Sequence, residues 1–384
     1  MKKFLSGGKS QLAVLAAFFT NGAVVATWVA RIPAIQIKLG LSEGTLGLIL
    51  FGAAAGTISA LSLVSGLIAR FGSAKVTLAG ALGACLFLPL LSITSSALIL
   101  FFTLFLFGAA LSAMDVAMNE QAVQVERNAG RALMSSFHAG FSIGGLAGSL
   151  LSAGMAALPA MPPFLHFSLV TVIFSAAMIF CYPHLLKEKQ EEPTKQVMFR
   201  LPERALWALG AIAFCSVIAE GAMADWSAVY LTRVLSTDTA LAALGYAAFS
   251  LTMTIGRLAG DQFARIWKPA AIVRAGSVIA VLGLIMIVST SDPIIAIAGF
   301  ATVGVGLANI IPLTFSAAGN FPGIPAGVGI TGVATFGYLG SLIGPPLIGS
   351  IAEAASLRMA LLLIALLVST LIITSKSISH RQKG

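Results

Sequence analysis

The sequence predicts an all-α membrane protein in which twelve transmembrane helices form two pseudo-symmetric six-helix bundles. Of its 384 residues, 58% are hydrophobic and only 10% are charged, and the mean hydropathy is +0.97. Soluble chains carry about 25% charged residues, so this composition indicates an integral membrane protein. Its apolar runs are about 20 residues long, the length that a helix needs to cross a bilayer. A transmembrane barrel would instead show short segments of alternating polarity.

Twelve apolar segments follow one another along the chain, most of them joined by short turns. The predicted helices lie at about residues 11–32, 44–69, 74–94, 97–122, 133–158, 164–184, 205–232, 240–264, 270–290, 292–316, 325–351 and 356–376. The longest polar stretch, "HLLKEKQEEPTKQVMFRLPER", runs from His184 to Arg204 and separates the sixth segment from the seventh. We therefore predict an amino-terminal bundle at 1–184, a cytoplasmic linker at 185–204 and a carboxyl-terminal bundle at 205–384.

The distribution of Lys and Arg predicts the orientation in the membrane. If the amino terminus is cytoplasmic, most basic residues fall in inner loops, and the outer loops hold Arg31, Lys38, Arg233 and Arg358. The positive-inside rule then places both termini in the cytoplasm. No cleavable signal peptide is evident, and we expect a multi-pass protein of a bacterial cytoplasmic (inner) membrane. The net charge of +9 reflects this topology and attraction to membrane lipids, and it does not indicate nucleic-acid binding.

The two halves of the chain resemble each other. "LGLILFGAAAGTIS" from Leu46 aligns with "LGYAAFSLTMTIGR" from Leu244, and "FSIGGLAGSLLSAG" from Phe141 aligns with "FGYLGSLIGPPLIG" from Phe336. "NGAVVATW" in the first helix is matched by "EGAMADW" in the seventh. Three matches in the same order indicate an internal repeat of six helices.

Six plus six helices in a parallel repeat, with a charged central linker, resemble the major facilitator superfamily over nearly the whole chain. This resemblance implies a substrate site near the membrane midplane between two halves that rock around it. The loop signature that the superfamily carries after the second helix reads "SGLIARFGSAK" here, so Arg70 is kept while Ala69 replaces the acid. The matching stretch after the eighth helix, "GRLAGDQFAR", keeps Asp261. Arg70 and Asp261 are therefore candidate residues of an inner gate.

A finer resemblance lies in "GAALSAMDVAMNEQAVQVERNAGRALMSSFHAGFSIGG", from Gly108 to Gly145. It is similar to the branch of the superfamily that contains fucose–proton symporters and rhizopine-transport-like membrane proteins. This resemblance implies uptake of a small polar solute coupled to protons. The first helix departs from it, because Asn21 stands where a fucose-type symporter is expected to place an acid. Proton coupling by that route is therefore not implied.

The fourth helix carries a polar stripe within an apolar span. A charge in a span is costly unless it faces a wet cavity or a partner, so each one is a functional candidate. Asp115 and Asn119 are four residues apart and share one face, with Ser112 one turn back. We predict that the stripe lines a cavity in which Asp115 binds substrate or a proton, with a structural hydrogen-bond network as the alternative.

The seventh helix carries Glu220 and Asp225 within the apolar stretch "AEGAMADW". Glu220 shares a face with Ser216 and Ser227 and is the best candidate for a buried carboxylate that loads and releases a proton. Asp225 lies nearer the outer end on the side of Arg233. It is either a substrate-cavity residue or one partner of an ion pair at a gate.

Two further charged groups are predicted to form salt bridges. Glu120 lies towards the cytoplasmic end of the fourth helix, where Arg127 or Arg131 could pair with it. Arg257 of the eighth helix precedes Asp261 by four residues, which favours an ion pair near the cytoplasmic end. The alternative role for Arg257 is to bind an anionic substrate.

Amide and aromatic side chains add to the candidate cavity. Asn21 and Trp28 are seven residues apart on the first helix, and Trp226 is the repeat equivalent of Trp28. Rings and amides together suit a sugar-like or polyol ligand, although the two Trp residues would also suit an outer interfacial belt. Asn309 of the tenth helix either lines the cavity or satisfies backbone groups freed at a kink before Pro312.

Small and titratable residues mark the fifth and eleventh helices. His138, near the start of the fifth helix, either shuttles protons or is a hydrogen-bonded packing residue. Glycines recur along both helices and predict close helix–helix contacts. They are Gly140, Gly144, Gly145 and Gly148 in the fifth helix and Gly337, Gly340, Gly344 and Gly349 in the eleventh.

These observations predict a secondary transporter that moves a small polar solute, with proton coupling through Asp115 or Glu220. No HExxH or GxGD motif and no nucleophile–base arrangement indicates an intramembrane enzyme, and we expect no cofactor or metal. Proton-driven efflux of an amphipathic drug or metabolite is the alternative function, and a non-transporting receptor on the same fold is a further one. We expect a monomer.

Overall fold

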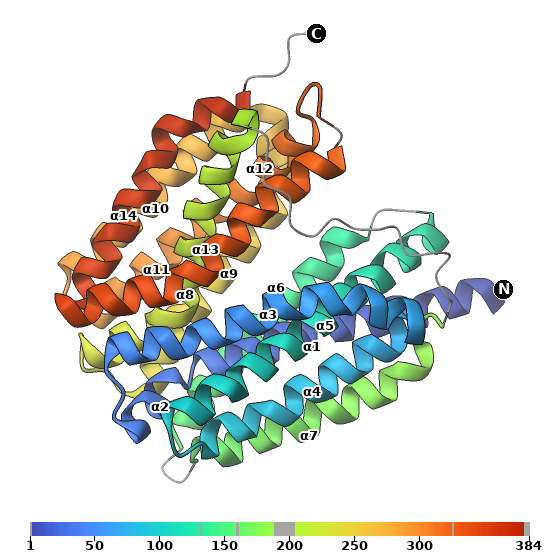
Figure 1. Ribbon diagram of the computed structural model, residues 1–384, viewed down its shortest axis with the longest axis horizontal. Helices are drawn as coiled ribbons and strands as arrows, with labels where there is room; N and C mark the ends of the chain where they lie inside the picture. Colours follow the sequence, from blue (N-terminus) through green and yellow to red (C-terminus); the bar gives the residue numbers. More distant parts are fainter. Residues whose placement is uncertain (1, 131–132, 159–160, 188–203, 325, 380–384) are drawn as a thin grey trace. The chain divides into compact units, whose positions relative to one another are not determined.

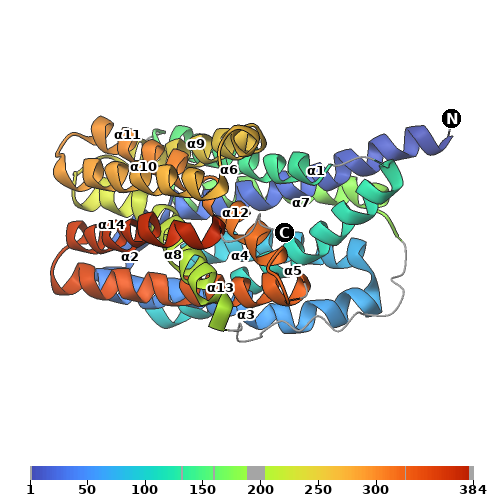
Figure 2. The ribbon, with the colours of Figure 1, turned by 90° about the horizontal axis from the view of Figure 1, so that it is seen from above.

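The computed structural model describes residues 2–130, 133–158, 161–187, 204–324 and 326–379 (Figure 1). Within these ranges the chain forms α-helices and short 3-10 helices, and no strand is present (Figure 2). Twelve helical segments of the described residues are long and apolar enough to cross a membrane. The predicted all-α class and the twelve spanning helices are thus confirmed.

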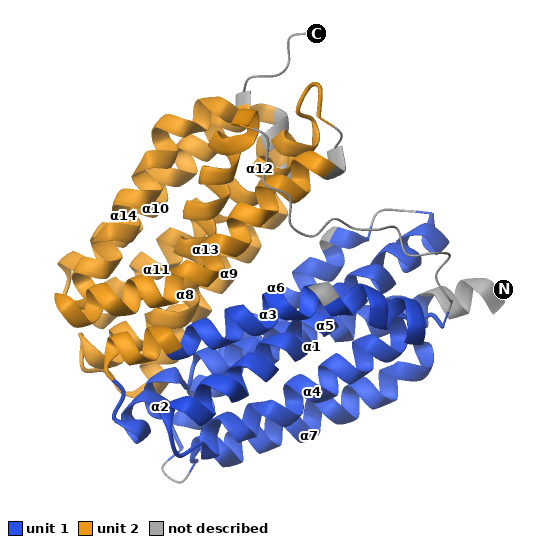
Figure 3. Ribbon diagram, in the orientation of Figure 1, with its two compact units in different colours: residues 1–41, 49–196 blue, residues 42–48, 197–384 orange. Residues whose placement is uncertain are grey.

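Two compact units divide the chain (Figure 3). Unit 1 holds residues 1–41 and 49–196, and unit 2 holds residues 42–48 and 197–384. Residues 42–48, which include the first turns of α3 (Glu43–Phe71), therefore group with unit 2, although the rest of α3 belongs to unit 1. Residues 188–203 of the predicted linker lie outside the described residues.

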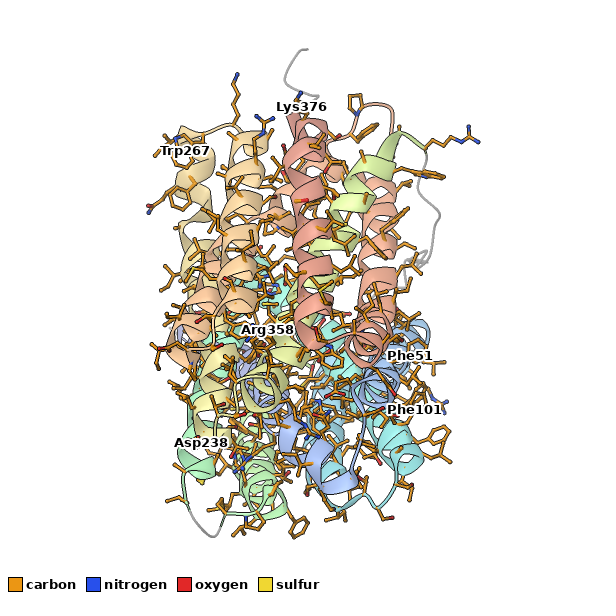
Figure 4. The ribbon with its side chains drawn as sticks, turned by 90° about the vertical axis from the view of Figure 1, so that its left-hand side faces the viewer. Phe51, Phe101, Asp238, Trp267, Arg358 and Lys376 are labelled. Carbon is orange, nitrogen blue, oxygen red and sulfur yellow. The ribbon has the colours of Figure 1, made fainter. Side chains whose placement is uncertain are left out.

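Unit 1 is a bundle in which α1 packs along α6, and α4 packs on both α5 and α7. Its elements are α1 (Lys2–Val29), α2 (Ile32–Leu39), α3 (Glu43–Phe71), α4 (Ser73–Ile93), α5 (Ala97–Ala129), α6 (Met134–Ala156), α7 (Pro163–Cys181) and the 3-10 helix η1 (Tyr182–His184). Phe51 of α3 stacks on Phe101 of α5, with ring centroids 6.5 Å apart (Figure 4). Phe18 of α1 is fully buried in the core beside Phe137 of α6.

Unit 2 repeats this packing order, because α8 packs along α13, and α10 packs on both α11 and α14. Its elements are η2 (Arg204–Leu206), α8 (Trp207–Arg233), α9 (Thr239–Ile266), α10 (Pro269–Ser289), α11 (Pro293–Leu307), α12 (Ile310–Gly319), α13 (Ala326–Ala354), α14 (Leu357–Thr374) and η3 (Ser375–Ser379). The helices that the sequence repeat pairs, α1 with α8 and α6 with α13, thus have matching neighbours.

Polar side chains fix the starts of several spanning helices. They are Ser96 before α5, Asp238 before α9, Asp292 before α11 and Ser356 before α14. Each accepts a hydrogen bond from a first-turn backbone N–H, which has no partner within the helix. The Leu241 N–H, for example, donates to Oδ1 of Asp238 over 2.8 Å.

Two spanning segments differ from their predicted form. The first does not end near residue 32: α1 closes at Val29, and the apolar stretch continues as α2, which begins at Ile32 with Pro33 in its first turn. The tenth is broken at Asn309, between α11 and α12. Proline explains both breaks, because it favours a helix start and because Pro312 has no N–H to donate to the carbonyl of Ala308.

Glycines bring helix backbones into contact in both units. Gly22 of α1 lies against the carbonyl of Phe141 on α6, where a Cβ atom would overlap that oxygen. Gly340 of α13 lies against the carbonyl of Phe214 on α8, and a Cβ there would come within 2.7 Å of it. Gly144 of α6, one of the predicted glycines, likewise lies against the carbonyl of Phe19 on α1, so the predicted close contacts are present at Gly144 and Gly340.

Candidate functional site

An ion pair within the spanning helices of unit 2 is the centre of the candidate site. Nη2 of Arg257 on α9 lies 3.2 Å from Oε2 of Glu220 on α8. The two side chains are 38% and 26% exposed, so neither is sealed in the core. The second carboxylate oxygen of Glu220, Oε1, is buried and has no hydrogen-bond partner. Glu220 therefore has one oxygen engaged by a cation and one oxygen free for a proton, a water or a ligand.

Arg257 has a partner that the sequence did not predict. The four-residue spacing favoured a pair with Asp261 on the same helix, but the guanidinium reaches across to α8. The side chain of Asp261 lies outside the described residues. Helical spacing alone cannot reveal such a contact, because Glu220 and Arg257 are 37 positions apart in the sequence.

A tyrosine that the sequence analysis did not single out lies on the same face of α9 as Arg257. Tyr246 of α9 is within electrostatic range of Asp225, Glu220 and Arg257. It precedes Arg257 by three full helical turns and so shares its face of α9. Tyr246, Asp225, Glu220 and Arg257 therefore lie along the facing sides of α8 and α9, and Glu220 and Arg257 are the two in direct contact.

Asp225 makes no salt bridge with Arg233 among the described residues, so the structure gives no support to the ion-pair alternative with that residue. Among the described residues, the carboxylate that forms a salt bridge is Glu220, with Arg257 as its partner. Arg233 is exposed at the end of α8, whereas Asp225 is half-buried two turns earlier. Asp225 belongs instead to the neighbourhood of Tyr246.

The face of α8 that carries Glu220 is polar and lacks protein partners. Oγ of Ser216 and Oγ of Ser227 are buried without a hydrogen bond, as is Oε1 of Glu220. At 100° per residue these three side chains lie within about 40° of one another around the helix. Buried polar atoms usually have a partner, so this stripe is suited to bind water or a polar ligand.

Asn309 supports the site from the break between α11 and α12. Its Nδ2 donates to the carbonyl of Gly256 over 3.0 Å, next to Arg257 in the sequence. Its Oδ1 also lies where a Cβ atom on Gly260 would be. Asn309 therefore holds the part of α9 that carries Arg257, rather than satisfying a backbone group at its own kink.

In unit 1 the structure brings Asp115 and Asn119 together on α5. Nδ2 of Asn119 donates to the backbone carbonyl of Asp115 over 2.9 Å and to its Oδ1 over 3.3 Å. The side chain of Asp115 is exposed, and Oγ of Ser112 is buried with no partner. The acid of this stripe is thus held by its own helix and has no cation beside it in the described residues.

Asn21 of α1 is buried, with 4% of its surface exposed. Its Nδ2 reaches the carbonyl of Leu111 on α5 over 3.5 Å, which is long for a hydrogen bond. The amide thus tethers α1 to α5, one turn from Asp115.

The two repeat-related tryptophans are interior residues. Trp28 is 5% exposed and Trp226 is fully buried, so the interfacial-belt interpretation is wrong for both. The exposed tryptophans are Trp207, at the start of α8, and Trp267, at the end of α9. Nε1 of Trp226 has no hydrogen-bond partner.

Comparison with known proteins decides the family. The sequence model of the Major Facilitator Superfamily matches residues 13–329. The chain belongs to this superfamily. An MFS-type transporter of Yersinia pestis is 35% identical over 379 residues, which cover 97% of each chain. The membrane protein MosC of Rhizobium meliloti is 33% identical over 352 residues, which cover 92% of this chain and 86% of MosC.

Solved structures give the same fold. A point mutant of the nucleoside transporter NupG matches with a TM-score of 0.77 at 13% identity, over 96% of this chain and 99% of that one. A bacterial homologue of the human lysosomal transporter Spinster, inward-facing and unoccupied, matches with a TM-score of 0.73 at 13% identity, over 98% and 99% of the two chains. At this identity the likeness shows the fold alone. The protein is an MFS transporter rather than an enzyme, with a small-molecule substrate and multiple membrane spans.

Of the residues predicted to form a gate in this MFS transporter, Arg70 and Glu120 have described side chains. Arg70 is exposed, and its guanidinium lies over the ring of Phe71, 5.1 Å from the centroid. Glu120 accepts a hydrogen bond from Nε2 of Gln124 over 3.2 Å and makes no ion pair with Arg127 among the residues described, so that predicted pair is wrong. Arg131, the alternative partner, lies outside the described residues.

His138 lies near the start of α6 in this transporter. Its side chain is exposed, and the ring meets Phe18 of α1 edge-on, with centroids 5.2 Å apart. The ring contact of His138 with Phe18 is a packing contact. Because the His138 side chain is exposed, its role as a proton shuttle stays a prediction.

Proposed function

We propose that this transporter moves a small polar solute, sugar-like or polyol-like, by alternating access and in exchange with or together with protons. Glu220 is the proposed proton-carrying acid. Asp115, Ser112 and Asn119 are the proposed partners of the solute hydroxyl groups in unit 1. The Arg257–Glu220 ion pair is the observation that carries this proposal.

The ion pair supports proton coupling for a physical reason. A proton on Glu220 removes the negative charge that attracts Arg257, so protonation and the α8–α9 contact compete. Asp225 and Tyr246 are within electrostatic range of each other, and Tyr246 is also within range of Glu220 and Arg257. A ligand that donates a hydrogen bond to the free Oε1 of Glu220 would alter this balance, which links solute occupancy to proton occupancy.

The polar groups of both units favour a hydroxyl-rich solute. A carboxylate accepts hydrogen bonds from solute hydroxyls, and a serine hydroxyl both donates and accepts. Oε1 of Glu220 and the hydroxyls of Ser112, Ser216 and Ser227 have no partner in the protein. The NupG structure is that of a nucleoside transporter, and nucleosides also present sugar hydroxyls. Nucleosides therefore join sugars, polyols and inositols among the candidate solutes.

The proposal also includes the membrane, the oligomeric state and the orientation of the protein. We place it in a bacterial cytoplasmic membrane, as a monomer with both termini in the cytoplasm, because Lys and Arg concentrate in the loops that this orientation makes internal. Efflux of an amphipathic compound is the competing function, since acids in a cavity also suit a lipophilic cation.

A thermal-shift screen on the detergent-purified protein tests the solute class. The panel holds sugars, polyols, inositols, nucleosides, amino acids and lipophilic cations, each at acidic and at neutral pH. A ligand of the folded state raises the melting temperature by mass action. We expect stabilisation by a hydroxyl-rich solute that depends on pH, and stabilisation by lipophilic cations alone would contradict the proposal and favour efflux. Flux of a stabilising solute into proteoliposomes separates a transporter from a receptor, which binds without flux.

A further inference from the structure

The start of α3 and the end of α13 are joined by a hydrogen bond within unit 2. Ser42 directly precedes α3, and its Oγ donates to Oε2 of Glu353, in the last turn of α13, over 2.9 Å. The same Oγ accepts a hydrogen bond from the Thr45 N–H over 3.2 Å. One serine hydroxyl therefore caps the start of α3 and binds the end of α13 at the same time.

The carboxylate of Glu353 lies at the favourable end of a neighbouring helix. Its own helix ends at Ala354, so it stands beside the partial negative charge of the α13 carboxyl terminus. The amino terminus of α3 carries partial positive charge and free N–H groups, which attract a carboxylate. Gly44 allows the close approach, because a Cβ atom there would overlap Oε2 of Glu353. The contact with α3 therefore offsets the unfavourable position of Glu353 on α13.

Glycines extend this contact along both helices. Gly47 of α3 lies against α13, where a Cβ atom would come within 2.5 Å of the Pro345 carbonyl oxygen and 3.0 Å of the Cα atom of Gly349. A Cβ atom on Gly349 would in turn come within 2.6 Å of the Glu43 carbonyl oxygen. Backbone meets backbone at these positions, so the two segments can separate there without unlocking packed side chains.

The segment that lies on α13 belongs to a helix with parts in both units. Residues 42–48 group with unit 2, and residues 49–71 of the same helix group with unit 1 (Figure 3). Because α3 is unbroken from Glu43 to Phe71, a movement of its unit 1 part pulls on its first turns. The start of α3 and the end of α13 lie on the membrane face opposite the amino terminus, since they belong to the second and the eleventh spanning segments.

We propose that Ser42 and Glu353 form a latch that closes the face opposite the two termini and opens when the transporter admits solute from that face. The latch rests on the alternating access proposed above, in which one half rocks against the other, but not on the solute or on the proton-coupling acid. A latch must be weak enough to break in each cycle, and an exposed hydrogen bond with a helix-dipole contact meets this requirement. The alternative is a permanent joint, in which residues 42–48 stay on α13 throughout the cycle.

Labelling of a cysteine in the candidate site measures the opening of this face without any solute. Full-length Glu220→Cys in liposomes is treated with a membrane-impermeant maleimide from the face opposite the termini, and the parent protein corrects for labelling of Cys85, Cys181 and Cys215. We expect Glu353→Ala to speed the labelling about threefold, because the closed state loses a hydrogen bond and a charge–dipole contact. Equal labelling rates with and without Glu353→Ala would overturn the latch and indicate a permanent joint.

Glu43→Ala is the matched control for the loss of an acid. Glu43 is in the first turn of α3, where its charge also meets the helix dipole, and its removal leaves the Ser42–Glu353 hydrogen bond in place. We expect Glu43→Ala to leave the labelling rate of Glu220→Cys unchanged. Equal acceleration by Glu43→Ala and Glu353→Ala would contradict the latch, since a loosened start of α3 would then explain both.

A second pair of variants tests the backbone contact and does not remove Glu353. Gly47→Ala places a methyl group against the Pro345 carbonyl, so it should push α3 off α13 and speed the labelling by about threefold or more. Gly66→Ala changes the same helix at a position where a Cβ atom would have no atom within 4 Å, and it should leave the rate unchanged. Unchanged labelling in Gly47→Ala, or equal acceleration in both glycine variants, would overturn the proposal. Glu353 is exposed, so Glu353→Ala is expected to fold even if Gly47→Ala does not.

Discussion

Helices α1 and α8 occupy equivalent places in the two repeats, yet their polar surroundings differ. Asn21–Gly22 of α1 aligns with Glu220–Gly221 of α8. In unit 1 the amide of Asn21 is buried against the Leu111 carbonyl, and Gly22 is pressed against α6. In unit 2 the carboxylate of Glu220 is half-buried and paired with Arg257.

The equivalent glycines, Gly22 and Gly221, also differ in how closely they are packed. A Cβ atom on Gly22 would overlap the carbonyl of Phe141, whereas a Cβ on Gly221 would have no atom within 4 Å. The equivalent position is therefore a helix contact in unit 1 and open space in unit 2. The two repeats keep the same helix order, but at this position only unit 2 has an acid beside open space. We infer that α1 supports its bundle while α8 presents the titrating group.

The largest effect on stability is expected from alanine at the two equivalent glycines. Gly22→Ala should destabilise the protein by about 1–3 kcal/mol, because the new methyl group overlaps a backbone oxygen. Gly221→Ala should be neutral or stabilise by up to about 1 kcal/mol, since alanine favours a helix and the space is open. Melting temperatures of the two variants decide this. Equal losses of stability in the two variants would contradict the open space beside Gly221.

A double-mutant cycle tests whether Glu220, unlike Asp115, is energetically coupled to an arginine. Glu220→Gln, Arg257→Gln and the double variant should give a coupling free energy of about 1 kcal/mol, because the pair is partly exposed. The same cycle on Asp115 and Arg70 serves as a control and should give about zero, since Asp115 has no cationic partner among the described residues. A coupling at Glu220–Arg257 no larger than in the control would contradict the ion pair.

The smallest effects are expected from the two buried amides. Asn309→Ala removes a 3.0 Å hydrogen bond to the Gly256 carbonyl and should cost about 1 kcal/mol. Asn21→Ala removes a 3.5 Å contact and should cost about 0.5 kcal/mol or less. The denaturation midpoints of the two variants measure these losses of stability. A larger loss for Asn21→Ala than for Asn309→Ala would contradict the expected order.

Hydropathy was sufficient to predict the twelve spanning helices, because the bilayer fixes their length and composition. The polar stripe of α5 was also predictable, since Asp115 and Asn119 are neighbours on one helix and need no other element to meet. The side-chain pairs between helices were not predictable. The partner of Arg257 depends on how α8 and α9 are rotated against each other. Arg31, between α1 and α2, is 4% exposed, and its burial depends on how the surrounding helices pack. Tyr246 was missed because a tyrosine in an apolar helix has no distinctive spacing of its own.

Solute-driven proton movement in proteoliposomes tests most directly whether Glu220 is the coupling acid. The solute is the hydroxyl-rich compound that most raises the melting temperature, and an entrapped pH-sensitive dye reports the protons. We predict that Glu220→Gln still exchanges labelled solute across the membrane but neither moves protons nor accumulates solute in response to a pH gradient. Asp115→Asn should keep the ratio of protons to solute while it weakens solute binding. Proton movement that persists in Glu220→Gln and is lost in Asp115→Asn would contradict the account and place the coupling in unit 1.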